Sequence, residues 1–239
     1  MIIPAFNEAA TLPGVLARLT AEVPECDVVV IDDGSSDGTA DIARASGVTA
    51  LRLPFNLGIG GALRTGFRYA VSEGYDRGVQ LDADGQHDPS QIRMLLDALD
   101  DADFVVGSRF GGKGAYDVGH TRRSAMRVLE LAVRVLSGRN FTDTSSGFRA
   151  FNRDVLEYFS RSYPSEYMES VEVLLAASYE GFRIVEVPVE MHQRAGGEAS
   201  TVRVGLIYHY LRVLVTMLTK ASRRRSTSSE VAEGSGSPK

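Results

Sequence analysis

Short apolar runs alternate with amphipathic stretches through the first half of the chain. The apolar runs lie at residues 2–3, 27–31, 48–53, 78–81 and 104–106. The run at 27–31 is rich in β-branched residues, which is typical of a strand buried on both faces. Stretches with helical periodicity lie between them, after Thr11 and at 39–45, 59–72 and 89–99. Alternating strands and helices predict an α/β fold with a mostly parallel sheet and helices on both faces.

The first helix has the clearest pattern. Leu12, Val15, Leu16 and Leu19 recur at the spacing of one helical face. Thr11 precedes them, and Pro13 falls in the first turn. Threonine is a common N-cap residue and proline is tolerated in the first turn, so we expect Thr11 to cap this helix.

The second half of the chain is less regular. It contains glycine-rich stretches at 111–119 and 192–201, helical patterns at 122–136 and 168–179, an alternating strand pattern at 183–191 and a last helix at 202–221. We expect one domain over residues 1–221, in which 1–110 form a ligand-binding half and 111–221 a second half with a C-terminal helix. The Ser/Gly/Glu-rich tail at 222–239 is predicted to be disordered.

The last helix has two interpretations. Its apolar run is too short to span a membrane, and His209 and Arg212 interrupt it. It either packs on the domain as a core helix or lies on a membrane surface. In the second case Lys220 and the basic run 223–225 would meet anionic headgroups.

Composition narrows the class of protein. The net charge of −5 makes a general nucleic-acid binder improbable. The single cysteine, Cys26, excludes an internal disulfide and fits a reducing compartment. Residues 1–4 lack the basic segment and long apolar run of a signal peptide, so we expect a cytoplasmic protein. The first apolar run is short for a strand, so we expect either that a few residues are missing or that the true start lies upstream.

The stretch QLDADGQHDP at residues 80–89 carries the first candidate chemistry. It places Asp82 and Asp84 directly after a short buried strand. Carboxylates at the carboxyl end of a strand lie where open α/β sheets bind ligands. Such hard oxygen ligands suit Mg²⁺ or Mn²⁺, which usually keep waters and substrate phosphates in their other positions. A polar turn is the alternative, since Asp, Gly and Pro are ordinary turn residues.

Polar residues follow three other predicted strands. They lie at residues 7–8, 32–33 and 108–109. Parallel strands end at the same edge of a sheet, so we expect all four polar segments to line one crevice. Arginine supplies paired hydrogen-bond donors that suit phosphates. Arg109 follows a predicted strand at this edge, which favours a phosphate-binding role for it. Arg194 is a weaker candidate that rests on its glycine-rich stretch.

Other candidates have plainer interpretations. Asp33 could accept hydrogen bonds from a nucleobase or ribose, or form a turn, although Asp37 fits the turn and cap role better. His87 is interpreted as part of the turn after Asp84. The segment 58–63 resembles a dinucleotide fingerprint but has Leu63 in the place of its last glycine. The sequence contains no P-loop lysine motif.

Taken together, these segments resemble a known family. IPAFNE at 3–8, VIDDGS at 30–35, QLDADGQ at 80–86 and VGSR at 106–109 look like successive motifs of the family 2 glycosyltransferases. DTSSGFR at 143–149 and residues 194–200 narrow the likeness to the polyprenyl-phosphate sugar synthases, the dolichyl-phosphate mannose synthase group. The likeness covers about residues 1–200 and is specific through the combination of motifs.

The resemblance implies a GT-A fold and an inverting transfer from a UDP- or GDP-sugar. By this likeness Pro4, Phe6, Glu8, Ile31 and Asp33 hold the nucleoside, Asp82 and Ala83 lie near the ribose and diphosphate, Asp84 and Gln86 bind Mg²⁺ or Mn²⁺, Arg109 and Arg194 contact phosphates, Asp143 lies near the transferred sugar or acceptor, and Arg149 belongs to the substrate-binding set. Family members often have Tyr where this chain has Phe6. Membrane attachment, peripheral and on the cytoplasmic face, is an inference.

Two kinds of acceptor remain open. A polyprenyl phosphate is already an anion near neutral pH, because phosphomonoesters have a second pKa of about 6. A hydroxyl acceptor needs a general base, for which Asp143 or Glu169 is the candidate. A nucleotide-sugar-binding module without turnover and a sugar-phosphate nucleotidyltransferase are the rival classes. The sequence does not decide the sugar, the nucleobase of the donor or the oligomeric state.

Overall fold

The computed structural model describes residues 1–110, 133–135, 137–164 and 169–192. The described strands form one seven-stranded sheet. They are β1 (Ile2–Ala5), β2 (Val29–Asp32), β3 (Thr49–Arg52), β4 (Arg77–Gln80), β5 (Phe104–Ser108), β6 (Arg149–Asn152) and β7 (Ile184–Pro188). Both halves of the chain contribute strands to this sheet.

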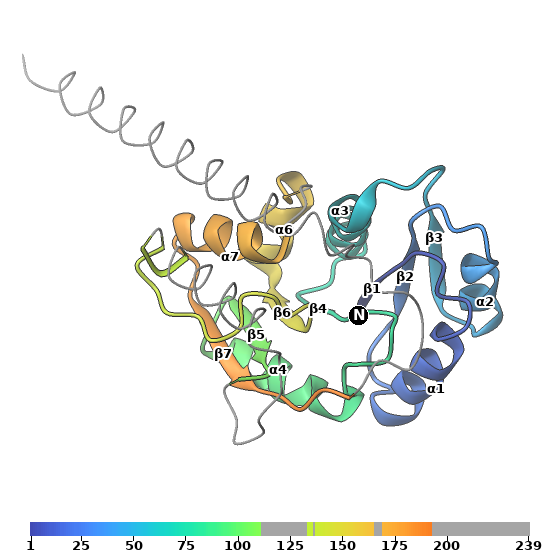
Figure 1. Cartoon of the computed structure of the whole chain (residues 1–239), viewed down its shortest axis with the longest axis horizontal. Helices are drawn as coiled ribbons and strands as arrows, with labels where there is room; N and C mark the ends of the chain where they lie inside the picture. Colours follow the sequence, from blue (N-terminus) through green and yellow to red (C-terminus); the bar gives the residue numbers. More distant parts are fainter. Residues whose placement is uncertain (111–132, 136, 165–168, 193–239) are drawn as a thin grey trace, which may run out of the picture.

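The order of the strands is β3-β2-β1-β4-β6-β5-β7 (Figure 1). Neighbouring strands pair in parallel except at β6, which runs antiparallel to both β4 and β5. The predicted mostly parallel sheet is therefore confirmed. Because β6 runs the other way, its amino end lies at the edge where β1, β2, β4 and β5 have their carboxyl ends.

Helices cover both faces of the sheet, as predicted. They are α1 (Leu12–Glu22), α2 (Thr39–Ala45), α3 (Gly58–Ser72), α4 (Ile92–Asp97), α6 (Arg153–Arg161) and α7 (Glu169–Tyr179), with single 3-10 turns η1 (Pro89–Gln91) and η2 (Ala98–Asp100) on either side of α4. The packing follows the alternation of side chains along each strand. Ile2 and Ile31 face α3, α6 and α7, whereas Ile3 and Val30 face α1, α2 and α4.

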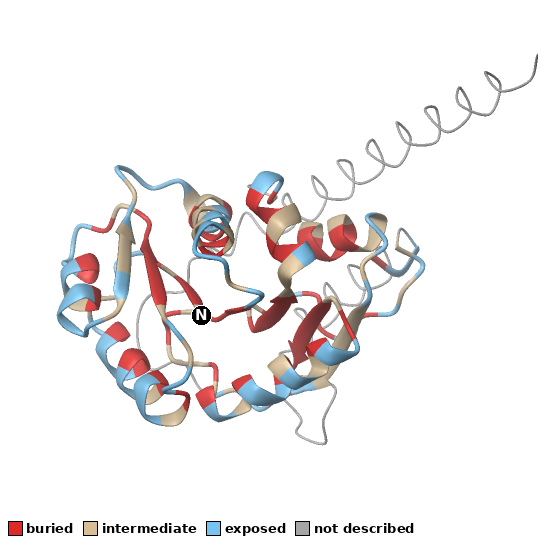
Figure 2. Cartoon of the chain, turned by 180° about the vertical axis from the view of Figure 1, so that it is seen from behind, coloured by how far each residue is buried: buried red, intermediate tan, exposed pale blue. Residues whose placement is uncertain are grey.

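The two helical layers are visible on either side of the sheet, and buried residues concentrate on the strands and on the helix faces turned toward them (Figure 2). The first helix buries the three leucines and the valine that the periodicity selected. Thr11 stands at its cap position but makes no capping hydrogen bond, which corrects the expectation. Its hydroxyl instead donates to Glu8.

Two elements were not predicted. Strand β6 and helix α6 follow directly on the DTSSGFR segment, and Asn152 caps the helix by accepting from the backbone N–H of Val155. The strand sequence, Arg-Ala-Phe-Asn, has no β-branched residue, which explains why the pattern of apolar positions did not reveal it. The predicted helices at 122–136 (apart from residues 133–135) and 202–221, and the tail at 222–239, lie outside the described residues.

Within the described ranges, no helix is both long enough and apolar enough to cross a membrane. The predicted division of the domain at residue 110 stays a prediction.

Candidate active site

The four polar segments predicted to line one edge do so. They follow β1, β2, β4 and β5, which are parallel to one another. The segment 142–148 joins them at the amino end of β6. The site is therefore built from five stretches of chain at one edge of the sheet.

The turn after β4 fixes the second carboxylate of the Asp-Ala-Asp sequence. Asp84 is largely buried, and one of its carboxylate oxygens accepts from the backbone N–H of Gln86 at 3.0 Å. Gly85 has a φ of 76°, the left-handed conformation that allows the chain to turn back. The side chain of Asp82 is 36% exposed. The turn thus presents two carboxylates of different exposure at the edge.

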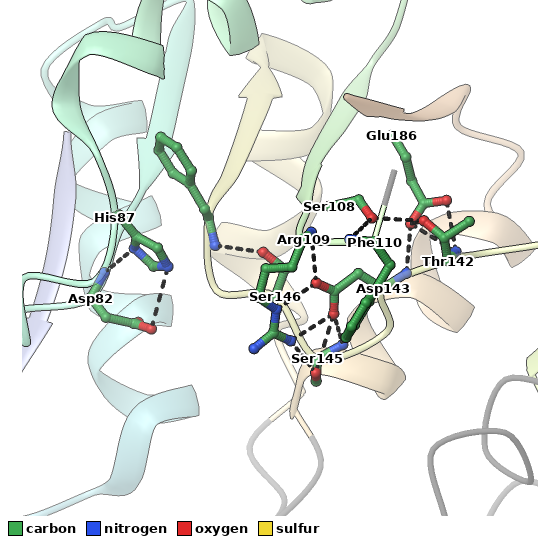
Figure 3. Close-up of polar contacts among 11 residues, drawn as sticks. Asp82, His87, Ser108, Arg109, Phe110, Thr142, Asp143, Ser145, Ser146 and Glu186 are labelled. Carbon is green, nitrogen blue, oxygen red and sulfur yellow. Dashed lines mark hydrogen bonds and ion pairs between the residues drawn. The ribbon is translucent and has the colours of Figure 1, made fainter. Parts of the chain in front are cut away.

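A buried histidine, His87, contacts this turn (Figure 3). The Nδ1 atom of His87 accepts from the backbone N–H of Asp82 at 3.0 Å, and Nε2 lies 3.9 Å from the Asp82 carboxylate. The ring stacks on Phe148, with 4.9 Å between ring centres. Burial lowers the pKa of His87 to about 4. The ring is therefore neutral at pH 7, and its proton lies on Nε2 because Nδ1 is an acceptor.

Charges from three segments surround this ring. The pKa of His87 is lowered mainly by burial; Asp84 and Asp143 act to raise it, and Arg109 and Arg149 act to lower it. These four residues belong to the segments after β4 and after β5 and to the segment 143–149.

Arg109 and Asp143 form a buried ion pair (Figure 3). Nε and Nη2 of Arg109 donate to the two carboxylate oxygens of Asp143 at 2.7 and 2.8 Å, and the backbone N–H of Arg109 donates at 3.2 Å. The side chain of Asp143 is 0% exposed and that of Arg109 16%. Burial acts to raise the pKa of Asp143, but the hydrogen bonds and charge of Arg109 outweigh it and hold that pKa below its usual value.

A second carboxylate, that of Glu186, binds the backbone at residues 142–143. Glu186, on β7, accepts from the backbone N–H groups of Thr142 and Asp143 and from the Thr142 hydroxyl. Sequence reasoning missed this residue. A charged residue inside the otherwise apolar strand 184–188 was the available signal.

The loops after β1 and β2 are tied together. Asn7 has a φ of 55°, which is uncommon for a residue other than glycine. Its backbone N–H donates to the Ser35 hydroxyl and its side-chain oxygen accepts from the backbone N–H of Ser36, both at 2.9 Å. Asp37 accepts from the backbone N–H of Ala9 at 3.0 Å. These bonds hold the two loops in one arrangement.

The predicted nucleoside-binding residues lie around these loops. Phe6 is 46% exposed. Pro4 pairs with Ile31 in the register of β1 and β2, and the side chain of Ile31 is fully buried in the core. The roles that the resemblance gives these two residues stay predictions. Glu8 contacts Thr11.

Asp33 is buried and contacts the loop that precedes α3. It accepts from the backbone N–H of Leu57 at 2.7 Å. Burial raises its pKa, and hydrogen bonds from the N–H groups of Leu57 and Gly58 partly offset this effect. Asp37 has the plainer role expected of it and accepts from the backbone N–H of Thr39 at the start of α2.

The oxygen donors at this edge fit a divalent cation. The described residues contain no group of three His, Cys, Asp or Glu side chains that could hold a metal by themselves. Mg²⁺ and Mn²⁺ need fewer, because they are commonly bound through one or two carboxylates plus substrate phosphates. Asp82, Asp84 and the amide of Gln86 are such hard ligands. Arg194 and the side chain of Glu169 lie outside the described residues.

Comparisons with known proteins agree with this architecture. Residues 1–159 match the sequence model of the family Glycosyl transferase family 2. An undecaprenyl-phosphate mannosyltransferase of Micrococcus luteus is 40% identical over 211 residues, which cover 83% of this chain and 85% of that protein. A polyprenol monophosphomannose synthase of Mycolicibacterium smegmatis is 34% identical over 207 residues, covering 82% and 78%.

A solved structure shares the fold. The glucosyl-3-phosphoglycerate synthase of Mycobacterium tuberculosis, in complex with Mn²⁺, UDP and phosphoglyceric acid, superimposes with a TM-score of 0.68 at 21% identity. The match covers 92% of this chain and 76% of that one. At this identity the likeness establishes the GT-A fold.

The neutral state of His87 predicts a pH dependence of stability. An unfolded histidine has a pKa of about 6.5, whereas His87 in the folded protein has a pKa of about 4. Between these values the unfolded chain binds one proton more, so the free energy of unfolding rises with pH. Lowering the pH from 7 to 4 should cost roughly 3 kcal/mol through this group.

Urea denaturation at a series of pH values measures the effect. The substitution His87→Gln removes the titrating group, so the variant should show a flatter profile between pH 4 and pH 6.5. Parallel profiles for the two proteins would mean that folding does not lower the pKa of His87.

Proposed function

The chain belongs to glycosyl transferase family 2 and is a glycosyltransferase, and we propose that it moves a sugar from a nucleoside-diphosphate sugar to a polyprenyl phosphate with inversion at the sugar. The two relatives at 40% and 34% identity are named undecaprenyl-phosphate mannosyltransferase and polyprenol monophosphomannose synthase. Both names specify mannose, which makes mannose the first sugar to test.

The state of Asp143 is the observation that carries the choice of acceptor. A hydroxyl acceptor needs a side chain that removes its proton. Asp143, the candidate base whose side chain the structure describes, is fully buried, paired with Arg109, and has a pKa below its usual value. A carboxylate in this state is a weak proton acceptor. A phosphate acceptor needs no such base, because it is already ionised near neutral pH.

The donor would lie across the loops after β1, β2 and β4. Pro4, Phe6, Glu8 and Asp33 supply the nucleoside contacts, with the backbone of Ile31 behind them. Asp82 and Ala83 stand toward the ribose and diphosphate. The hydrogen bonds that join the loops after β1 and β2 keep this surface in one shape before the donor binds, which lowers the cost of ordering it.

Asp84 and Gln86 would hold a divalent cation, assisted by the more exposed Asp82. When bound, such a cation stabilises the negative charge that grows on the leaving nucleoside diphosphate. Arg109 and Arg149 add positive charge at the same edge, where burial makes electrostatic interactions stronger than in water. Arg109 is fixed by Asp143, so its charge is oriented before the substrate arrives.

The lipid acceptor implies contact with a membrane. Among the described residues no helix spans one. We therefore propose peripheral contact with a membrane surface.

The acceptor test compares three compounds. The purified protein is incubated with labelled GDP-mannose or UDP-sugars, Mn²⁺ and either a polyprenyl phosphate, the matching polyprenol, or a free sugar. Transfer should occur to the phosphate alone, with a rate that rises through a pH of about 6 as the phosphate loses its second proton. Equal transfer to the polyprenol or to the free sugar would replace the proposed acceptor by a hydroxyl.

The metal test uses Asp84→Asn, which removes one negative charge with little change of shape. We expect kcat to fall by about 10²–10³-fold, the usual cost of losing one electrostatic contribution to a transition state. EDTA should remove wild-type activity, and Mn²⁺ with GDP or UDP should raise the melting temperature of the wild-type protein but not of the variant. The exposed Asp41→Asn is the matched control. Undiminished activity of Asp84→Asn in EDTA would exclude the metal role.

The close approach of Gly147 to Asp82 gives a third test. A Cβ atom at residue 147 would lie 2.7 Å from one carboxylate oxygen of Asp82, so Gly147→Ala should displace that carboxylate. We expect a loss of activity on the order of 10²-fold, as for a misplacement of about 1 Å in an active site. Gly14→Ala is the control, since a Cβ there meets nothing within 4 Å. Similar activity in both variants would show that the position of Asp82 is unimportant.

A further inference from the structure

Glu186 occupies an unusual place for a carboxylate on the last described strand. It lies on β7, beside Val106 of the parallel neighbour β5, and the same register brings Pro188 beside Ser108, the residue before Arg109. No motif drew attention to it. Its side chain nevertheless reaches the turn that carries Asp143 (Figure 3).

The contacts of Glu186 are concentrated on two consecutive residues. One carboxylate oxygen accepts from the backbone N–H of Asp143 at 2.8 Å, from that of Thr142 at 2.9 Å and from the Thr142 hydroxyl at 3.1 Å. The other oxygen accepts from the Thr142 N–H at 2.8 Å. Charge-assisted hydrogen bonds of this kind are stronger than neutral ones. The carboxylate therefore fixes the backbone from which the Asp143 side chain projects.

The same turn is fastened to the neighbouring strand. The hydroxyl of Thr142 lies 2.7 Å from that of Ser108, and the Ser108 hydroxyl accepts from the backbone N–H of Phe110. Thr142 is thus hydrogen-bonded both to Ser108 of β5 and to Glu186 of β7. Most of the hydrogen bonds that hold Thr142 come from the carboxylate of Glu186.

The position of the Arg109 side chain depends on the position of Asp143. The two side chains meet through two parallel hydrogen bonds, a geometry that tolerates little displacement of either partner. A shift of the 142–143 backbone would therefore move the guanidinium. We infer that Glu186 is a positioning residue of the transfer reaction, which acts by holding Asp143, and through it Arg109, in place. This inference rests on the proposed function.

A positioning role predicts a particular kinetic signature. If Glu186 acts through Arg109 on the transition state, its loss lowers kcat and leaves the KM of the nucleotide sugar nearly unchanged. A displacement of about 1 Å can reduce the rate by about 10²-fold. A purely structural role would instead reduce the amount of folded protein without changing kcat per folded molecule.

The experiment compares Glu186→Ala, Glu186→Gln and Glu190→Ala. Glu190 is an exposed carboxylate four residues further on, and its contacts with Gln91 are made by its backbone, so its substitution controls for the loss of a charge near this edge. Glu186→Ala should lower kcat by 10-fold or more, within the range of about 10²-fold expected for misplacement. Glu186→Gln keeps an amide oxygen for the two N–H groups and should recover most of the activity.

A double-mutant cycle tests whether the effect passes through Asp143. In the Asp143→Asn background, Glu186→Ala should cost far less than in the wild-type protein, since residues that act as one unit are not additive. Independent, multiplying losses would overturn the inference, as would a wild-type kcat in Glu186→Ala.

Two outcomes need separate interpretation. If Glu186→Ala does not fold, Glu186→Gln and Thr142→Val, which removes one hydrogen bond to Glu186, decide the question by the same split between kcat and KM. Absence of transfer by the wild-type protein to any acceptor contradicts the proposed function, whereas normal transfer by both the wild type and Glu186→Ala contradicts the positioning role alone.

Discussion

The ion pair between Arg109 and Asp143 is the interaction on which the site depends. Two charges removed from water are costly unless their geometry is good and their remaining hydrogen-bonding groups are satisfied. Here the pair is bidentate, and Asp143 also accepts from the backbone N–H groups of Arg109 and Ser145. These bonds outweigh burial and keep the carboxylate ionised. The pair is therefore a fixed element of the edge and a poor source of proton-transfer chemistry.

The antiparallel strand β6 makes this pair possible. Arg109 follows the carboxyl end of β5, and Asp143 lies 34 residues later in the chain. In an all-parallel sheet the chain would have to return to the opposite edge before each strand. Because β6 runs against its neighbours, the segment before it arrives at the same edge. Arg149 then pairs with Gln80 of β4 and Val106 of β5 in the register of β6.

The turn after β4 is joined to the same assembly through apolar and close contacts. His87 stacks on Phe148 and accepts from the backbone of Asp82, while Gly147 leaves room for the Asp82 carboxylate. A neutral histidine is suited to this place because it fills apolar space and still serves as an acceptor. The donor-side carboxylates and the buried ion pair are thus parts of one packed unit, so a displacement in one is transmitted to the other.

The sequence by itself determined the class of fold and the edge on which the chemistry lies. β-Branched runs such as 27–31, and the polar residues that follow Leu81 and Val106, contain this information locally, because burial on both faces and turn chemistry depend on neighbouring residues. Only the tertiary structure decided which side chains interact at that edge. Strand β6 lacks a local signature, the pairing of Arg109 with Asp143 spans 34 residues, and the bond from Glu186 to the Asp143 backbone spans 43. Such contacts follow from the strand order of the sheet, which no local pattern records.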